Sequence, residues 1–330
     1  MFEELLEIIE KNDSIVIFGH DNPDGDCYGS QIGLREILRL NYPNKKVFAV
    51  GSGIRRFFST IAPMDNIEDD IIKNSLAIIL DGNDLGRMED RRVYNAKEFI
   101  KIDHHIENGR FTQGKFVLDT DVNSTCELIV RFVKEANWKV NPTICNALYL
   151  GIVTDSGRFQ FIEDFPTAFY EAAWLCENGA NPKKLDTLLN TTNEGALAFK
   201  GYVYTHYKKS KHGVIYMTFT KDKLRELHVS PFKAGAMVNL LNNVKGYPIW
   251  AFFCENYDST CHIEMRSNGP AVQPVAASMG GGGHLCAAGV TLPDMSNKTI
   301  RKVIAKLDNA IITDKKESKY YVGKTIRSRD

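Results

Sequence analysis

The sequence predicts an α/β protein in which a doubly wound, mainly parallel sheet is followed by a smaller α+β domain. The first part is indicated by short runs that are apolar on both faces, as in parallel strands covered by helices, and by helix-like segments that alternate with them. Closely spaced strand-like runs after residue 210 indicate the second part. The 330 residues suffice for two domains with a core each.

The first domain is expected over residues 1–185. Its start, "MFEELLEIIEKND", has apolar residues at helical spacing, which is typical of an amphipathic helix and not of a signal peptide. The apolar runs predict strands at 14–20, 45–51, 75–82 and 97–105, and the other segments predict helices at 27–40, 123–138 and 141–153. Elements in this order favour a doubly wound sheet.

The second domain is expected over residues 211–312, after a helical linker at 186–210. Its apolar runs predict strands at 213–220, 247–256 and 260–267, which are close enough to form a meander with helices packed on one face. Residues 313–330 are basic and weakly patterned, so we expect a solvated tail. The active-site cleft is expected between the two domains.

Composition limits the partners that the protein can have. With 41 Lys and Arg against 41 Asp and Glu, the chain has no net charge that would attract nucleic acid or membrane, so a local site with short substrates is favoured. Its seven cysteines include no C-x-x-C pair, which is typical of reduced thiols. No window approaches 18 uninterrupted apolar residues. We expect a soluble cytoplasmic protein that does not enter membranes.

Metal-capable side chains follow the predicted strands. They are His20, Asp24 and Asp26 in "IFGHDNPDGDCYGS", Asp81 after the third run, Asp103, His104 and His105 after the fourth, and Asp155 at the end of a helix. In an open parallel sheet, groups in such loops meet at the carboxyl ends of the strands. Crowded carboxylates repel one another unless divalent cations compensate them. Imidazole and carboxylate ligands without a thiolate favour Mn²⁺ or Mg²⁺, and their number favours two ions that share a carboxylate, a clamp suited to phosphate.

A second group of residues predicts a phosphate-binding pocket in the smaller domain. The stretch "MGGGGHLCAAG" has consecutive glycines that let the backbone approach an anionic or planar group. An arginine at the end of the last predicted strand offers a fork of donors for a terminal phosphate. The predicted substrate-binding residues are Arg266, Ser267, Asn268, Gly282, Gly283 and His284.

These motifs together resemble those of a known superfamily. Residues 20–26, 81, 103–105 and 154–159 are similar to the four motifs of the DHH phosphoesterases, and "RS" with "GGGHLCAAG" resembles the DHH-associated C-terminal domain. The resemblance covers nearly the whole chain in order. In size and layout the chain is most similar to the NrnA-type oligoribonucleases, which also dephosphorylate 3′-phosphoadenosine 5′-phosphate (pAp).

The resemblance implies two divalent cations, Mn²⁺ foremost, with Mg²⁺ or Co²⁺ as alternatives. A water between them, its pKa lowered by both charges, would be the nucleophile. The implied ligands are His20 and Asp24 for one ion, Asp26, His104 and Asp155 for the other, and Asp81 as the bridge.

The resemblance also implies roles outside the ligand set. His105 would donate to the scissile phosphate or act as general acid, and Asp103 would orient a histidine.

Cys27 stands where small or aliphatic residues are more usual in this family. We interpret it as a core residue, with an approach to the metals as the alternative.

The expected enzyme is a phosphodiesterase that hydrolyses short oligonucleotides to mononucleotides, as a 3′–5′ exoribonuclease, and converts pAp to AMP. Its expected partners are short single-stranded RNA or DNA and pAp, with no obligate protein partner and a homodimer left open. The alternatives are an inorganic pyrophosphatase or polyphosphatase on the same scaffold and a catalytically silent nucleotide-binding module. Arg266 and His284 favour a nucleotide substrate over pyrophosphate.

Overall fold

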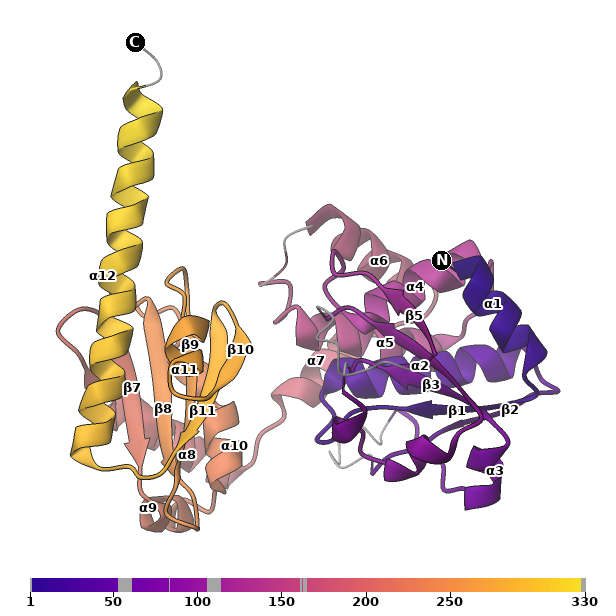
Figure 1. Ribbon diagram of the computed structural model, residues 1–330, viewed down its shortest axis with the longest axis horizontal. Helices are drawn as coiled ribbons and strands as arrows, with labels where there is room; N and C mark the ends of the chain where they lie inside the picture. The colour runs from indigo at the N-terminus through magenta and orange to yellow at the C-terminus, as the bar shows by residue number, and fades with distance from the viewer. Residues whose placement is uncertain are drawn as a thin grey trace. The chain divides into compact units, whose positions relative to one another are not determined.

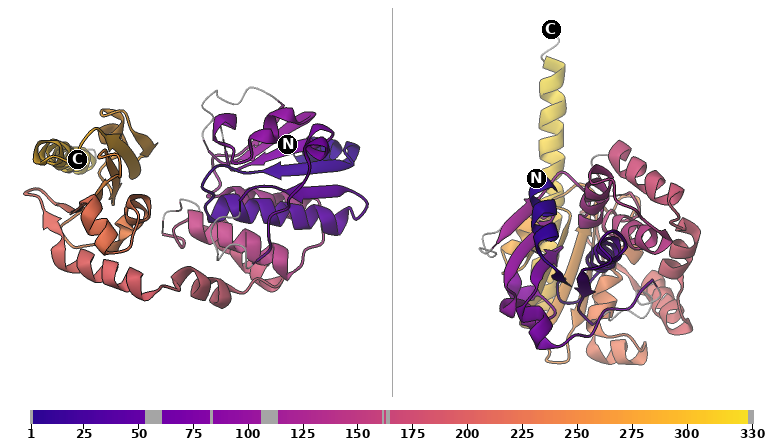
Figure 2. Two further views of the ribbon diagram at one scale, coloured as in Figure 1. Left: turned by 90° about the horizontal axis from the view of Figure 1, so that it is seen from below. Right: turned by 90° about the vertical axis from the view of Figure 1, so that its right-hand side faces the viewer.

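The computed structural model of the protein describes residues 2–52, 61–82, 84–105, 114–160, 162 and 165–327. The chain divides into two compact units, residues 1–191 and residues 192–330 (Figures 1 and 2). Each unit has its own sheet and its own hydrophobic clusters. No helix in the described part of the chain is both long and apolar enough to cross a bilayer.

The first unit contains a five-stranded sheet in which every pair of neighbours is parallel. The strand order is β2-β1-β3-β4-β5. The bounds are β1 (Ser14–Phe18), β2 (Lys46–Ala49), β3 (Leu76–Leu80), β4 (Glu98–Asp103) and β5 (Lys115–Leu118). The first four strands confirm the sequence prediction, whereas β5 was not predicted. This edge strand has four residues, and only Val117 among them is buried, so its apolar pattern is weak.

Helices cover both faces of this sheet. Successive side chains of a strand point to opposite faces, so Ile15 and Ile17 pack with the longer helices, whereas Val16 and Phe18 pack into the cluster on the other face. The helices of the first cluster are α1 (Phe2–Lys11), α2 (Gly25–Asn41), α4 (Thr125–Glu135), α5 (Pro142–Asp155) and α6 (Phe165–Glu177). The second cluster holds α3 (Asp69–Lys73), η2 (Leu85–Arg87) and η3 (Arg91–Asn95). This arrangement confirms the predicted doubly wound class.

A stripe of glycines lets α2 and α5 approach closely. Gly25, Gly29 and Gly33 are spaced four residues apart on α2, and a Cβ atom on each would collide with α5. At Gly29 the obstacle is the backbone carbonyl oxygen of Ala147, which cannot turn away as a side chain can. This contact places the two helices whose ends carry Asp26 and Asp155 side by side.

We therefore expect Gly29→Ala to lower the free energy of unfolding by about 1–3 kcal/mol, because α2 and α5 must move apart. Urea unfolding followed by circular dichroism measures the change. Gly201→Ala is the matched control, since Gly201 is also inside a helix but a Cβ atom there would meet nothing within 4 Å. That variant should be more stable by roughly 0.5–1 kcal/mol. Equal effects at the two positions would contradict the packing argument.

The second unit contains a six-stranded mixed sheet in the order β10-β11-β9-β8-β7-β6. Its bounds are β6 (Lys208–Lys209), β7 (Val214–Phe219), β8 (Ile249–Glu255), β9 (Cys261–Ser267), β10 (Gly282–His284) and β11 (Ala287–Leu292). The predicted meander is wrong in one pairing, because β7 and β8 are parallel. Residues 221–241 between them form a crossover of α9 (Lys221–Glu226), α10 (Pro231–Ala236) and η4 (Val238–Leu241).

The prediction that helices pack on one face of this sheet is also wrong. Phe199 and Val203 of α8 (Glu194–His206) are buried with α9 and α10 against one face. Val303 and Leu307 of α12 (Asn297–Arg327) are buried with α11 (Gln273–Ala277) against the other. The expected linker region thus comprises α7 (Pro182–Asn190) in the first unit and α8 in the second. Helix α12 also runs through the expected tail as far as Arg327, drawn in yellow in Figure 1.

Candidate metal centre

The sequence-predicted metal ligands lie at the point where the strand order of the first sheet reverses. This point is between β1 and β3, where crevices of doubly wound sheets bind ligands beyond the carboxyl ends of the strands. His20 follows β1, Asp81 follows β3, and His104 follows β4. Asp26 lies in the first turn of α2, and Asp155 is the last residue of α5.

Two helix N-termini hold the aspartates of the first motif. Asp24 is the N-cap of α2, and its Oδ1 accepts hydrogen bonds from the backbone N–H groups of Asp26 and Cys27, both at 3.0 Å. The carboxylate of Asp26 accepts from the N–H groups of Thr125 (2.7 Å) and Cys126 (2.9 Å) in the first turn of α4. Because helix N-termini favour negative charge, these hydrogen bonds lower the pKa of both carboxylates and so oppose burial, which raises it.

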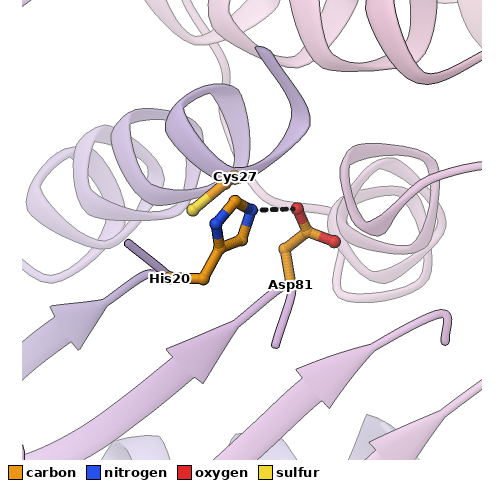
Figure 3. A group of neighbouring side chains, drawn as sticks. All are labelled: His20, Cys27 and Asp81. Carbon is orange, nitrogen blue, oxygen red and sulfur yellow. Dashed lines mark ion pairs between the residues drawn. The ribbon is translucent and has the colours of Figure 1, made fainter. Parts of the chain in front are cut away.

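Asp81 is at the centre of the cluster and is 3% exposed. Its carboxylate lies 3.6 Å from His20 Nε2 (Figure 3), 3.7 Å from His104 Nε2 and 3.6 Å from His105 Nδ1. Thr125 Oγ1 donates a hydrogen bond to Asp81 Oδ1 at 3.2 Å. The Asp81 backbone has φ +55°, a left-handed conformation that aspartate and asparagine tolerate better than most residues. Asp81 is therefore placed where one carboxylate can serve several ligand groups.

Two histidines have the orientation typical of metal ligands. Nδ1 of His20 lies 2.8 Å from the carbonyl oxygen of Asp21, and Nδ1 of His104 lies 3.4 Å from that of Val122. Since a carbonyl only accepts, each Nδ1 carries the hydrogen, and in the neutral ring Nε2 presents a lone pair to the cluster.

The lone pair of His104 Nε2 faces the carboxylates of Asp26, Asp81 and Asp155. This buried atom has no hydrogen-bond partner within the described residues. It lies 3.4 Å from Asp155 Oδ2 and 4.0 Å from Asp26 Oδ2, in addition to Asp81. A lone pair surrounded by carboxylate oxygens fits a shared cation.

The crowding of buried carboxylates also shifts the pKa values of the groups in this cluster. Burial and the carboxylates of Asp81 and Asp24 raise the pKa of Asp155 to about 8, and burial together with Asp81 and Asp155 raises the pKa of Asp26 well above its ordinary value. Burial opposes a charge on His20, yet Asp81 and Cys27 outweigh it and raise the pKa of His20 to about 12. Without a cation, the cluster can hold these carboxylates together only by retaining protons.

Three overlapping groups of the described residues could hold a metal ion, with ligand atoms within 4.8 Å of one another. They are Asp26, His104 and Asp155; Asp81, His104 and His105; and His20, Cys27 and Asp81. The structure thus brings together His20, Asp26, Asp81, His104 and Asp155 from the predicted ligand set. Asp24 lies near enough for Asp81 and His20 to influence its pKa, although none of the three groups includes it.

Asp103 and His105 form a pair at the end of β4. Asp103 Oδ1 accepts from the backbone N–H of His105 at 3.1 Å and lies 2.8 Å from His105 Nδ1. Asp103 Oδ2 lies 3.5 Å from Nζ of Lys101, which is fully buried in β4. Burial lowers the pKa of His105, but the hydrogen bond with Asp103 and the charges of Asp81 and Asp155 outweigh it and raise this pKa to about 9.

Three contributors to this site were missed by the sequence analysis, namely Lys101 and the first residues of α4, Thr125 and Cys126. Lys101 has no distinguishing signal, since a lysine within an apolar strand is usually read as an exposed interruption. The start of α4 could have been found, because Ser124 and Glu127 have the spacing of a helix-capping pattern, and Ser124 accepts from the N–H of Glu127.

The predicted phosphate-binding residues lie in the second unit, on three neighbouring strands. The strand register pairs His284 of β10 with Ala287 of β11, and Ala287 with Arg266 of β9, so the three residues form one row across the sheet. Arg266 Nη1 donates to Glu264 Oε2 at 2.8 Å, and His262 Nε2 lies 3.0 Å from Glu264 Oε1. Glu264 thus orients the guanidinium group.

The remaining predicted residues flank this row. Ser267 is buried, and its Oγ has no hydrogen-bond partner within the described residues. Asn268 is exposed after β9, and Gly282 is exposed in β10. Gly283 has φ +132°, and a Cβ atom there would overlap the carbonyl oxygen of Ala287, so this position requires glycine.

The parallel α/β sheet and the cluster of His and Asp side chains at the carboxyl ends of its strands indicate an α/β enzyme whose site could hold divalent cations. Comparison with known proteins specifies the class. Residues 14–152 match the DHH family, N-terminal domain, and residues 212–313 match the DHHA1 domain. The chain belongs to the DHH phosphoesterase family, whose members are metal-dependent.

Relatives with assigned names agree with this family, and a solved structure has the same fold. The chain is 36% identical to the bifunctional oligoribonuclease and PAP phosphatase NrnA of Mycoplasma genitalium, over 94% of this chain and 97% of the relative. It is 34% identical to the protein of the same name from Mycoplasma pneumoniae, over 91% and 94%. An exopolyphosphatase-related protein from Bacteroides fragilis has the same fold, with a TM-score of 0.84, 23% identity and coverage of 94% and 97%.

Proposed function

We propose that the protein is a metal-dependent phosphoesterase that hydrolyses short oligonucleotides to mononucleotides and pAp to AMP. The observation that carries the proposal is the position of Asp81, whose carboxylate lies within 3.7 Å of three histidine rings at the switch point of the sheet. The substrate class is supported by the names of the Mycoplasma relatives. The uncompensated charge of the cluster is the reason to infer cations.

We assign two divalent ions, Mn²⁺ first, to this cluster. When bound, they would supply Lewis-acid stabilisation of the charge on the scissile phosphate. His20, Asp24 and Asp81 would hold one ion, and Asp26, His104, Asp155 and the shared Asp81 would hold the other. The N–H groups at the start of α4 hold Asp26 in place for this role.

His105 is assigned to the substrate phosphate. Because Asp103 Oδ1 holds Nδ1 of the ring, Nε2 is the atom that donates a hydrogen bond or a proton to a phosphate oxygen. Asp103 positions the ring and does not itself touch the substrate. The raised pKa of His105 keeps this ring protonated near neutral pH, as a donor requires.

The second unit is assigned to the part of the substrate away from the scissile bond. Arg266 would form charge-assisted hydrogen bonds with a terminal phosphate, and His284 stands in the same row of the sheet. The buried hydroxyl of Ser267 and the positions at Asn268, Gly282 and Gly283 complete the proposed pocket.

Arg266→Ala is accordingly expected to raise KM for pAp about 10- to 100-fold, the loss of roughly 1.5–3 kcal/mol from a hydrogen bond with a charged group, and to change kcat little. Steady-state kinetics with saturating Mn²⁺ separate the two constants. Arg225→Ala, which removes an exposed arginine from the same unit, should leave both unchanged. A fall in kcat without a rise in KM would contradict the assignment of Arg266 to substrate binding.

The proposed function is tested by the turnover of pAp, a 5′-phosphorylated dinucleotide, a long oligonucleotide and pyrophosphate, each with Mn²⁺ and with chelator. We expect metal-dependent release of mononucleotide from the dinucleotide and of phosphate from pAp, with the long strand slower. Turnover of pyrophosphate alone would overturn the substrate class while leaving the metal centre in place. No turnover of any substrate would overturn the proposal.

A further inference from the structure

The thiol of Cys27 lies inside the candidate metal centre. Cys27 belongs to the first turn of α2 and is fully buried. Its Sγ, a ring nitrogen of His20 and a carboxylate oxygen of Asp81 lie within 4.8 Å of one another, and Figure 3 shows the sulfur beside the imidazole ring. Zinc lies about 2.0–2.3 Å from its sulfur, nitrogen and oxygen ligands. Small side-chain rotations would therefore bring all three atoms to one ion.

Neighbouring groups hold the sulfur in this place. A Cβ atom on Gly19 would lie 2.5 Å from Cys27 Sγ, so the absence of a side chain at Gly19 makes room for the sulfur. The thiol donates a weak hydrogen bond to Gln31 Oε1 at 3.8 Å, and Gln31 Nε2 donates to the carbonyl oxygen of Val50 at 3.0 Å, which fixes the orientation of the amide. The backbone N–H of Cys27 is bound by Asp24, itself a proposed ligand.

The other buried thiols of this unit belong to none of the candidate ligand groups among the described residues. Cys145 is a residue of α5 that packs into the hydrophobic core. Cys126 Sγ donates to the backbone carbonyl oxygen of Asp26 at 3.6 Å and belongs to none of the three candidate ligand groups. Among the buried thiols that the structure describes in this unit, Cys27 is the one whose sulfur lies within reach of both a histidine nitrogen and a carboxylate oxygen in a candidate ligand group.

We propose that Cys27 Sγ is a ligand of the ion held by His20 and Asp81. As the metal–sulfur bond forms, the thiol proton passes to solvent or buffer, and the site becomes a mixed nitrogen, oxygen and sulfur site. Thiolate ligands favour Co²⁺, Zn²⁺ and Cd²⁺ over Mg²⁺ and Mn²⁺. One end of the centre thus accepts softer ions than the carboxylate-rich end around Asp26 and Asp155. This inference rests on the metal centre proposed above.

Cobalt titration of the metal-free full chain tests the inference without measuring hydrolysis. Bound Co²⁺ gives weak visible d–d bands, and a cobalt–thiolate bond adds an intense near-ultraviolet charge-transfer band. We expect both in the unaltered protein and in the control Cys145→Ser. In Cys27→Ser the charge-transfer band should disappear while the visible bands remain. Isothermal titration should also show that Cys27→Ser weakens the binding of Cd²⁺ about tenfold or more beyond any change in the binding of Mn²⁺.

The possible failures are distinguishable. Visible bands without a charge-transfer band in the unaltered protein would overturn the role of Cys27 and leave the metal centre standing, and this result does not depend on whether a variant folds. A charge-transfer band that persists in Cys27→Ser would assign the sulfur ligand to another residue and overturn the proposal. Absence of all cobalt bands and of heat on titration would overturn the metal centre itself.

Discussion

Asp81→Asn is expected to lower kcat for metal-dependent hydrolysis of pAp about 1000-fold, equivalent to about 4 kcal/mol of transition-state stabilisation. The substitution removes one negative charge from the only carboxylate that lies within 3.7 Å of all three histidine rings among the described residues. Two ions held apart by their own repulsion need a shared anionic ligand, and an amide oxygen does not supply its charge. Both ions should therefore bind more weakly.

Asparagine is the informative substitution because it changes the charge and little else. It tolerates φ +55° at this position, and its amide oxygen can still accept from Thr125 Oγ1. Alanine would add backbone strain and a buried unpaired hydroxyl. Kinetics and Mn²⁺ titration calorimetry on the same preparations provide the measurement. The control Asp70→Asn, at a side chain 89% exposed, should be neutral, and a near-normal kcat for Asp81→Asn would end the two-ion assignment.

The sequence alone could predict the first sheet and the members of its cluster for a physical reason. Strands buried on both faces are apolar throughout, as the fully buried β3 is, so their ends are marked where polar residues begin. His20, Asp81 and His104 each follow such an end, and parallel strands bring their carboxyl ends to the same edge of the sheet. Placement at that edge needed no knowledge of the tertiary structure.

Features that depend on pairing between distant segments could not be predicted in this way. An apolar run does not show whether its neighbour is parallel, so the crossover between β7 and β8 was taken for a meander. The amides of Thr125 and Cys126 reach Asp26 across about 100 positions of sequence, as the separations of 99 and 100 show. Backbone donors leave no mark in residue type. The proximity of Cys27 to His20 and Asp81 likewise depends on how α2 is rotated over the sheet. The glycines of α2, Gly29 among them, set this rotation by packing against α5.

Mn²⁺ is expected to stabilise the first unit, and more strongly at higher pH. With free Mn²⁺ at 100 times its dissociation constant, linkage adds about 2.7 kcal/mol, a rise in Tm of about 5–10 °C for a unit of this size. In the metal-free protein the folded pKa of Asp155 is about 8, against 3.8 for the ordinary value. The stability that its proton contributes is complete at low pH and is lost as the pH rises through about 8.

Metal binding requires the ionised carboxylate, so protons compete with Mn²⁺ below this pKa. Two pH units below it, at about pH 6, the affinity should be at least about 100-fold weaker than that of the fully ionised site. Free Mn²⁺ at about 100 times the dissociation constant of the ionised site should then add only about 0.4 kcal/mol. The proton on His20, whose pKa is about 12, acts in the same direction. Calorimetric melting under nitrogen at about pH 6 and pH 8, with Mn²⁺ and with chelator, measures the difference. A rise in Tm that is equal at both pH values, or larger at pH 6, would show that these side chains do not hold the ion, whereas loss of the rise in Asp81→Asn would locate it there.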